Sequence, residues 1–240
     1  MNYGKNATML RLRKYDSKGT KLFNKIKIIV LKVFLVVVIV AGAAGISSGI
    51  GIMNGIISSA PDISKIDVTP TGYSTTVLAA NGEETATLVG QGANRQYVTI
   101  DEIPLDLQHA FVAIEDERFY KHNGIDLHGI GRAFLSGLSK GSFNEGASTI
   151  TQQLIKNNVL TSWTSETSFV EKLQRKIQEQ YLALELEKKV NDKDWILENY
   201  MNSVNLGANT LGVEAASKKY FNKDVSELTL SESAVIAGIT

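Results

Sequence analysis

The sequence predicts a mainly α-helical domain that follows an N-terminal transmembrane helix and a small β-containing linker. Three observations lead to this fold class. A charge-free apolar run begins at Val33, after a basic N-terminus. A hairpin pattern surrounds Asn81-Gly82. Beyond Pro104, apolar residues recur at helical spacing, and strand-like alternation is absent from the sequence. The 240 residues allow one large domain or two small ones.

The apolar segment predicts a membrane anchor at residues 28–50. Its run "IIVLKVFLVVVIVAGAAGI" carries one charge, Lys32, and about 20 such residues span a bilayer as a helix. Residues 1–27 form a basic tail with a single acid, Asp16. The positive-inside rule places this tail in the cytoplasm and everything after the anchor outside. A cleaved signal peptide, with "AGAAG" as its cleavage site, is the alternative.

The composition excludes several classes of protein. Lys+Arg and Asp+Glu are 25 each, so the net charge is zero, and membrane topology and anionic lipid explain the basic tail. Nucleic acid is therefore not an expected partner. The chain has no cysteine for a disulfide framework. A zinc site is not expected either, because the three histidines are scattered at positions 109, 122 and 128.

Residues 51–100 have the composition of a linker with a short β-hairpin. "STTVLAANGEETATLV" places Asn81-Gly82 at the turn. Residues 101–240 form the main domain. Helical spacing predicts helices within 104–122, 171–189, 194–205 and 211–221, and a capping box at Thr229 and Glu232 predicts one more.

The stretch "GASTITQQLIKN" predicts a helix with an unusual number of polar groups. Thr149 and Gln152 fit a capping box that begins a helix near Ile150. On that helix Gln152 and Lys156 share one face, and helix N-termini attract anions. The alternative is an amphipathic surface helix with a good cap.

Two further segments carry candidate chemistry. In "EDERFYKHNGID", Glu115 lies four residues from both Phe111 and Phe119, and a carboxylate desolvated by aromatic rings suits a general base. The alternative is an exposed glutamate paired with Arg118. In "RKIQEQ", two cations flank Glu179 at helical spacing, and an ordinary helix ion-pair set is the alternative.

In this order, the segments resemble the peptidoglycan glycosyltransferases, which include the membrane-proximal domain of class A penicillin-binding proteins and the monofunctional glycan polymerases. The resemblance covers roughly residues 95–240 through "EDERFYKHNGID", "GASTITQQLIKN", "RKIQE", "ILENYMN", and "GVEAASKKYF" with "LSESAVIAG". The run "VLTSWTSETSFVEKLQRK" lacks the arginine that the family usually places before its third motif. Family members continue beyond "AVIAGIT", so the domain is expected to be C-terminally truncated, and no serine-x-x-lysine transpeptidase signature follows residue 105.

The resemblance implies a lysozyme-like, two-lobed fold and a membrane-anchored enzyme. Such an enzyme polymerises lipid II into glycan strands, with inversion at the anomeric carbon and release of undecaprenyl pyrophosphate. It implies Glu115 as the catalytic base and Glu179 as a second catalytic acid. The substrate-binding residues that it implies are Asp116, His122, Ser148, Thr149, Gln152, Lys156, Arg175, Lys176 and Glu198.

The resemblance also implies the partners of the site. A divalent cation (Mg or Mn) held by Glu179 would bridge the phosphates, and no organic cofactor is expected. Expected partners are lipid II, the growing glycan strand, the membrane and the cell-wall synthesis machinery. Trp163, Phe169 and Val170 are expected to dip into the bilayer of the bacterial cell membrane. Phosphoglycolipid inhibitors of the moenomycin type are expected to occupy the donor site.

Two other functions are compatible with the same residues. One is a catalytically impaired scaffold that binds lipid II, left by truncation. The other is a glycan-cleaving enzyme on the same fold, in which water replaces the sugar acceptor.

Overall fold

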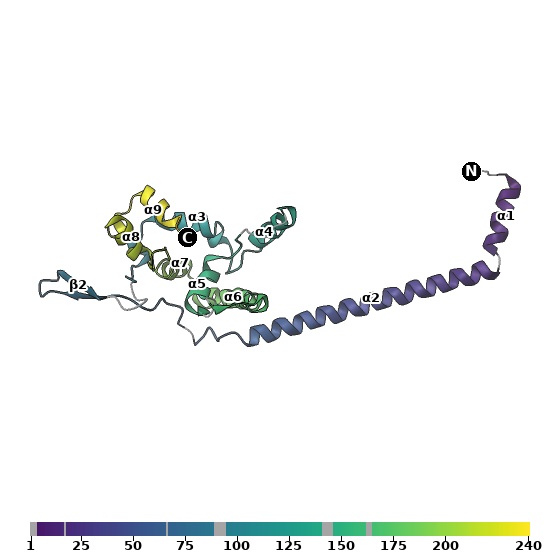
Figure 1. Cartoon of the computed structure of the whole chain (residues 1–240), viewed down its shortest axis with the longest axis horizontal. Coiled ribbons are helices and arrows are strands. Elements are labelled where there is room, and N and C mark those ends of the chain that lie inside the picture. The colour runs from purple at the N-terminus through teal and green to yellow at the C-terminus, as the bar shows by residue number, and fades with distance from the viewer. Residues whose placement is uncertain (1–3, 17, 66, 89–94, 141–145, 162–164) are drawn as a thin grey trace. The chain divides into compact units, whose positions relative to one another are not determined.

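The computed structural model describes all residues except 1–3, 17, 66, 89–94, 141–145 and 162–164. The chain divides into two compact units, Met1–Gly55 and Ile56–Thr240. The first contains helix α1 (Lys5–Asp16) and most of helix α2 (Lys18–Ser58). The second contains one two-stranded sheet and the remaining helices, so the prediction of a mainly α-helical protein with an N-terminal apolar helix is confirmed (Figure 1).

Helix α2 is longer than the predicted anchor at residues 28–50. Gly19–Ser58 is long and apolar enough to cross a membrane, and its most apolar window is not buried within the protein. At 1.5 Å per residue the whole helix is about 60 Å long, roughly twice the thickness of a bilayer core. This length and composition are those of a membrane-spanning helix or of a signal sequence.

The predicted hairpin is confirmed. Strand β1 (Thr75–Leu78) pairs antiparallel with strand β2 (Glu84–Leu88), and the register is shifted once, between Val77 and Leu78. Gly82 at the turn has φ +85°, a conformation in which a side chain would be strained. Asn81 stabilises the turn because its Oδ1 accepts from the Glu83 N–H at 3.1 Å.

The segments around the hairpin contribute to the core instead of forming a simple linker. Ile63, Val68 and Val98 are buried among the helices of the domain. Asn158 Nδ2 donates to the Val68 carbonyl at 3.0 Å. Asn202 bonds both backbone groups of Val98, at 2.8 and 3.0 Å. Tertiary contacts of this kind leave no periodic pattern in the sequence. Composition alone therefore predicts a linker in this region.

The main domain contains seven described α-helices and three short 3₁₀ helices. The α-helices are α3 (Leu105–Glu115), α4 (Leu127–Lys140), α5 (Ile150–Asn158), α6 (Phe169–Val190), α7 (Lys193–Met201), α8 (Val213–Phe221) and α9 (Leu230–Ala237); the 3₁₀ helices are η1 (Ile100–Glu102), η2 (Phe119–Lys121) and η4 (Val225–Glu227). Helix α4 was not predicted, because its glycines lower helix propensity.

The helix expected within residues 104–122 is interrupted. Helix α3 ends at Glu115, and Asp116 takes φ −159° before the chain turns into η2. The single helix face expected to hold Phe111, Glu115 and Phe119 is therefore not formed. The cause is tertiary: the Asp116 carboxylate accepts hydrogen bonds from the Ile150 N–H and from His122, which hold it outside the helical path.

Side-chain caps mark the starts of α5 and α9. Thr149 Oγ1 accepts from the Gln152 N–H at 3.2 Å, so α5 begins as predicted, but the reciprocal bond of the predicted capping box is not formed, because the Gln152 side chain bonds the Gly124 carbonyl. Thr229 and Glu232 form the predicted capping box of α9. Such caps are typically worth about 1 kcal/mol each.

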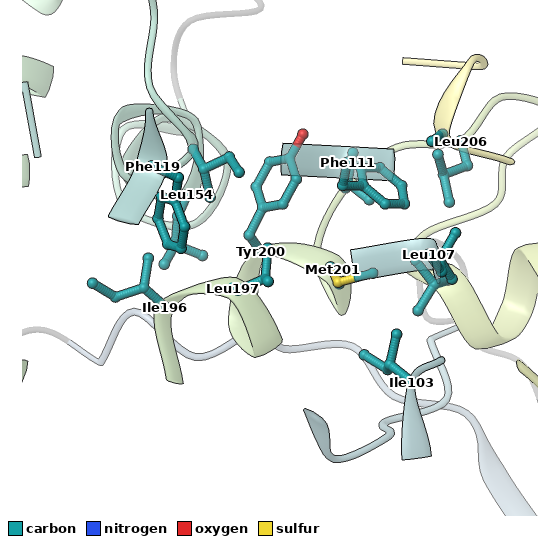
Figure 2. Close-up of a cluster of buried hydrophobic side chains, with 14 of the residues drawn as sticks. Ile103, Leu107, Phe111, Phe119, Leu154, Ile196, Leu197, Tyr200, Met201 and Leu206 are labelled. Carbon is teal, nitrogen blue, oxygen red and sulfur yellow. The ribbon is translucent and has the colours of Figure 1, made fainter. Parts of the chain in front are cut away.

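The core lies where α3, α5 and α7 meet, and α9 packs on α3 (Figures 1 and 2). Figure 2 shows Tyr200 between Leu154 and Phe111, and the rings of Tyr200 and Phe111 meet edge to face at 6.0 Å. Each large apolar side chain buried in this way contributes about 1.5–3 kcal/mol. The packing holds the C-terminal end of α3, and with it Glu115, beside α5.

Candidate active site

A cavity of about 340 Å³ brings three of the sequence motifs together. Its walls come from the last turn of α3, the start and one face of α5, and the middle of α6. Its lining residues are Ile114, Glu115, Gly146, Ser148, Gln153, Lys156, Lys176 and Glu179. We call it the central cavity. It contains both predicted catalytic acids and three of the predicted substrate-binding residues.

Glu115 is half-buried at the end of α3. The alternative in which it pairs with Arg118 is contradicted, because Arg118 instead binds Asp126 through two nitrogens, at 2.5 and 3.0 Å. That pair holds the pKa of Asp126 down at about 2. Glu115 accepts a hydrogen bond from Gln153 Nε2 at 2.6 Å. Its carboxylate thus faces the central cavity.

The glutamine in this cavity is Gln153, whereas the sequence predicted Gln152. Gln152 is buried, and its Nε2 donates to the Gly124 carbonyl at 3.4 Å. Its backbone N–H is capped by Thr149, whose hydroxyl donates to the same carbonyl at 2.7 Å. Thr149 and Gln152 therefore hold α5 in place and do not line the central cavity.

Glu179 is buried between two cations, as its spacing predicted. Its side chain is 1% exposed, and it forms ion pairs with Arg175 and, at 2.8 Å, with Lys176. Lys176 also donates to Ser148 Oγ at 2.7 Å, which links α6 to the start of α5. Glu179 therefore organises the cations of α6.

Arg175 lies outside the central cavity. Its Nε contacts both carboxylate oxygens of Glu166, at 2.8 and 2.9 Å, and another nitrogen binds Glu179. It lines a separate cavity of about 300 Å³ with Glu166 and Gln178. Two carboxylates already offset its charge, so its predicted direct contact with substrate phosphate is not supported by this geometry.

Lys156 lies on α5 and is half-buried in the wall of the central cavity. Burial lowers its pKa, and the positive charges of Lys176 and Arg175 act in the same direction. The carboxylates of Glu179 and Glu115 oppose this shift. The two lysines give the cavity the positive charge that an anionic group would meet.

Asp116 and His122 form a buried pair. His122 Nε2 lies 2.9 Å from Asp116 Oδ1, and Asp116 Oδ2 accepts from the Ile150 N–H at 3.1 Å. A carboxylate at a helix N-terminus also meets the favourable end of the helix dipole. Both residues were predicted to bind substrate; in the structure they link the end of α3 to the start of α5, and Asp116 also lines a small cavity beside Glu115.

Glu198, also predicted to bind substrate, lies away from the central cavity. Its carboxylate on α7 accepts from the Tyr97 hydroxyl and, at 2.6 Å, from the Ile100 N–H. Together with Asn202 it fastens the segment before α3. In the motif "ENYMN", Glu198 and Asn202 therefore hold the segment before α3 in place, and Tyr200 has a different role.

A second, smaller cavity of about 150 Å³ lies against Glu115 and Ser148 and is also lined by Arg118, Asp126 and Arg132. We call it the side cavity. It shares Ile114, Glu115, Gly146 and Ser148 with the central cavity. A carboxylate between two adjoining cavities is placed to act on groups held in both.

The predicted divalent cation finds no protein-built site among the described residues. No group of three or more His, Cys, Asp or Glu side chains there is arranged to hold a metal. Both oxygens of Glu179 are engaged by Arg175 and Lys176. Because Mg²⁺ and Mn²⁺ favour carboxylate and carbonyl oxygens, this cationic donor set does not fit them.

Comparison with known proteins identifies the family. The family model described as Transglycosylase matches residues 81–240. The chain belongs to the transglycosylase family. The match confirms the predicted relationship, and the central cavity lies within the matched transglycosylase residues.

The curated relatives are penicillin-binding proteins. "Penicillin-binding protein 1A" of Clostridium botulinum (strain Langeland) is 43% identical over 217 residues, which cover 88% of this chain and 24% of the relative. "Penicillin-binding protein 1F" of Bacillus subtilis is 44% identical over 166 residues, covering 69% of this chain and 22% of the relative. The transglycosylase chain thus spans about a quarter of the length of the curated relatives it matches.

Sequence reasoning missed four residues that build the site. Gln153 and Tyr200 support Glu115, Glu166 binds Arg175, and Gly124 joins the first two motifs. A glycine inside the polar run "KHNGID" is a signal for a special backbone conformation, and Gly124 has φ +87°. The other three are recognised only by long-range contacts.

Proposed function

We propose that this domain transfers a glycosyl group from a lipid-linked donor to the sugar of lipid II and so polymerises peptidoglycan strands. One observation carries the proposal: Glu115 lies between two cavities and shares the larger one with Lys156 and Lys176. A base beside two lysines is an arrangement that suits transfer from a pyrophosphate donor. The family match supports the same reaction class.

In the proposed step Glu115 acts on the acceptor. Its carboxylate takes the proton from the 4-hydroxyl of the acceptor N-acetylglucosamine as that oxygen forms a bond to the anomeric carbon of the donor. The bond from that carbon to the pyrophosphate oxygen breaks, and undecaprenyl pyrophosphate leaves with the electron pair. Because attack and departure occur on opposite faces, the anomeric configuration inverts.

The leaving pyrophosphate gathers negative charge, which the central cavity is suited to meet. Lys156 and Lys176 supply positive charge from α5 and α6, and Ser148 adds a hydroxyl at the start of α5. Preorganised charges of this kind stabilise a developing anion strongly, because they need no reorganisation during the reaction. We assign the donor to the central cavity and the acceptor to the side cavity.

Lipid-linked substrates require contact with a membrane. Helix α2 is proposed as a single-pass anchor, with the basic tail in the cytoplasm and the domain outside. At the start of α6, Phe169 and Val170 are 77% and 69% exposed, as expected of residues that dip into the bilayer. Trp163, expected to do the same, lies outside the described residues. Helix α4 exposes Phe134, Leu135 and Leu138 and is assigned the same role.

Product analysis with labelled lipid II tests the proposal. The full chain in lipid vesicles should form glycan polymer, and Glu115→Gln should slow polymerisation by about 10²–10⁴-fold, because general-base catalysis is worth that much. Moenomycin should still bind the variant, since the cations of the central cavity remain. Glu185→Gln, which alters a glutamate paired with Lys188 outside both cavities, should behave as wild type.

The outcomes separate the three functions. Polymer formation supports the transferase. Lipid II that is bound but unreacted would indicate a scaffold, and shortened strands would indicate a glycan-cleaving enzyme. Near-normal polymerisation by Glu115→Gln would refute the assigned base.

A further inference from the structure

Two hydrogen bonds lead from the core of the domain to Glu115. Gln153 Nε2 donates to Glu115 Oε2 at 2.6 Å, and the Tyr200 hydroxyl donates to Gln153 Oε1 at 3.4 Å. The three residues come from α3, α5 and α7. Neither Gln153 nor Tyr200 is among the site residues that the sequence implied.

The chemistry of the groups fixes the direction of both bonds. An ionised carboxylate only accepts hydrogen bonds, so the amide nitrogen of Gln153 must face Glu115. The amide oxygen then faces Tyr200. Burial raises the pKa of Tyr200, and the charge of Glu115 raises it further, so the phenol stays protonated and remains a donor.

Core packing fixes the position of Tyr200, which lies at one end of this series of hydrogen bonds. Tyr200 is fully buried, and its ring meets Phe111 edge to face (Figure 2). Phe111 lies one turn before Glu115 on α3. The rigid phenol therefore favours the same orientation of the Gln153 amide as Glu115 does, and the amide bond limits the rotation of the Glu115 carboxylate.

We propose that Gln153 is a positioning residue for Glu115 and that Tyr200 sets the orientation of the Gln153 amide. The proposal rests on the proposed function, in which Glu115 is the base. The amide bond occupies one carboxylate oxygen, so that the other accepts the substrate proton. This makes Glu115 an oriented proton acceptor.

The test is the pH dependence of kcat for lipid II polymerisation by the full chain in lipid vesicles. Gln153→Glu puts a second carboxylate against Glu115, so the two share a proton, and the acid limb should move up by about 1 pH unit or more. Gln153→Met keeps the length but removes the donor. It should lower kcat about tenfold with little change in KM, because misorientation of a reacting group is costly.

Tyr200→Phe removes only the hydroxyl at the far end of the hydrogen-bond series and should lower kcat as Gln153→Met does, but by less. Tyr220→Phe is the matched control, because its hydroxyl donates to the Leu206 carbonyl at 2.7 Å outside both cavities. It should match wild type. Thermal unfolding of each variant shows which ones fold, and if Gln153→Glu does not, Gln153→Met and Tyr200→Phe decide the question.

Three results would overturn the inference while leaving the proposed function intact. The first is a lower kcat with an unmoved acid limb in Gln153→Glu, which is what a merely structural role gives. The second is a raised KM at unchanged kcat, which would make Gln153 a substrate ligand. The third is a Tyr200→Phe variant identical to wild type. Failure of the wild-type chain to make polymer would instead refute the proposed function, and this inference with it.

Discussion

The surroundings of the central cavity lower the pKa of one lysine, Lys156. Burial lowers its pKa, and two neighbouring cations act in the same direction, so Lys156 loses its proton at a lower pH than a solvated lysine does. Anions bind the protonated form. The contribution of Lys156 to donor binding should therefore fade earlier as the pH rises.

This predicts the pH dependence of inhibitor affinity. Moenomycin affinity should fall on the alkaline side in wild type, and Lys156→Arg should keep its affinity to higher pH, because arginine stays charged. Lys156→Ala should lose roughly 10- to 150-fold in affinity near neutral pH, since hydrogen bonds to charged groups are worth roughly 1.5–3 kcal/mol. Calorimetric titration measures this, with Lys188→Ala as the control because Lys188 pairs with Glu185 on the surface of α6. Unchanged affinity in Lys156→Ala would leave Lys156 a structural residue.

Adding one methyl group at Gly124 is predicted to lower the free energy of unfolding strongly. Its φ is +87°, and a Cβ there would lie 2.7 Å from the Ala183 carbonyl oxygen on α6. Gly124→Ala should lower the free energy of unfolding by about 2–4 kcal/mol through strain and displacement of α6. Gly131→Ala in α4, with nothing within 4 Å, is the control and should gain about 0.5–1 kcal/mol. Equal stabilities in urea denaturation would contradict this account.

Among individual residues, ion pairs were easier to predict from the sequence than the contacts of amide side chains. The spacing of Arg175, Lys176 and Glu179 predicted their ion pairs, because helical geometry alone brings them together. Gln152 and Gln153 could not be told apart in the same way. What draws Gln152 inward is the Gly124 carbonyl, which is 28 residues away in sequence.

Among the elements, the pairing of α3 with α9 matters most for the site. Helix α3 carries Glu115 at its end, and α9 packs against it (Figure 1). Ile236 of α9 is fully buried in the shared core. The last described helix of the chain therefore supports the proposed base.

Ile236→Ala should lower stability by about 2–5 kcal/mol, the usual cost of such a cavity. It should also speed hydrogen exchange of the α3 amides, because α3 loses its support. Val235→Ala is the control, since Val235 is 56% exposed on the same helix, and its effect should stay within roughly 0.5 kcal/mol. Unchanged α3 protection alongside a loosened α9 would show that the two helices are independent.

Most helices could be predicted, because apolar spacing and caps act locally. The boundaries at Thr149 and Thr229 follow from their hydroxyls. The end of α3 could not be predicted in this way, because Asp116 leaves the helix for partners on two other segments. Helix α4 was hidden by its glycines, which lower helix propensity, although its apolar residues recur at helical spacing.

For the molecule as a whole, the absence of cysteine offers a clean test of topology. Single cysteines placed at Asn6→Cys and Asn81→Cys would report on opposite sides of α2, and both positions are exposed. An impermeant maleimide added to intact cells stripped of their wall should label Asn81→Cys only, because the basic tail stays inside. Labelling of Asn6→Cys should require permeabilised cells. The reverse pattern would refute the proposed orientation.

The division into an apolar helix and a helical domain was predictable from composition, whereas the role of residues 51–100 was not. Three apolar residues of this region enter the core through contacts with helices that come later in the sequence. Such contacts have no local signature. The turn signal at Asn81-Gly82 predicted the hairpin, whereas the core contacts of its flanks could not be predicted from a local pattern.

The packing of α3 on α9 has a consequence for the order of events during synthesis. Glu115 leaves the ribosome long before Leu230, and at roughly 5–20 residues per second the interval is about 6–20 s. Throughout that time α3 exists without the helix that covers it, and its apolar face is open to other chains. Pausing within this window would prolong exposure of Leu107 and Phe111. The helix that carries the proposed base is thus among the first parts of the domain to be synthesised and among the last to be covered by its packing partner.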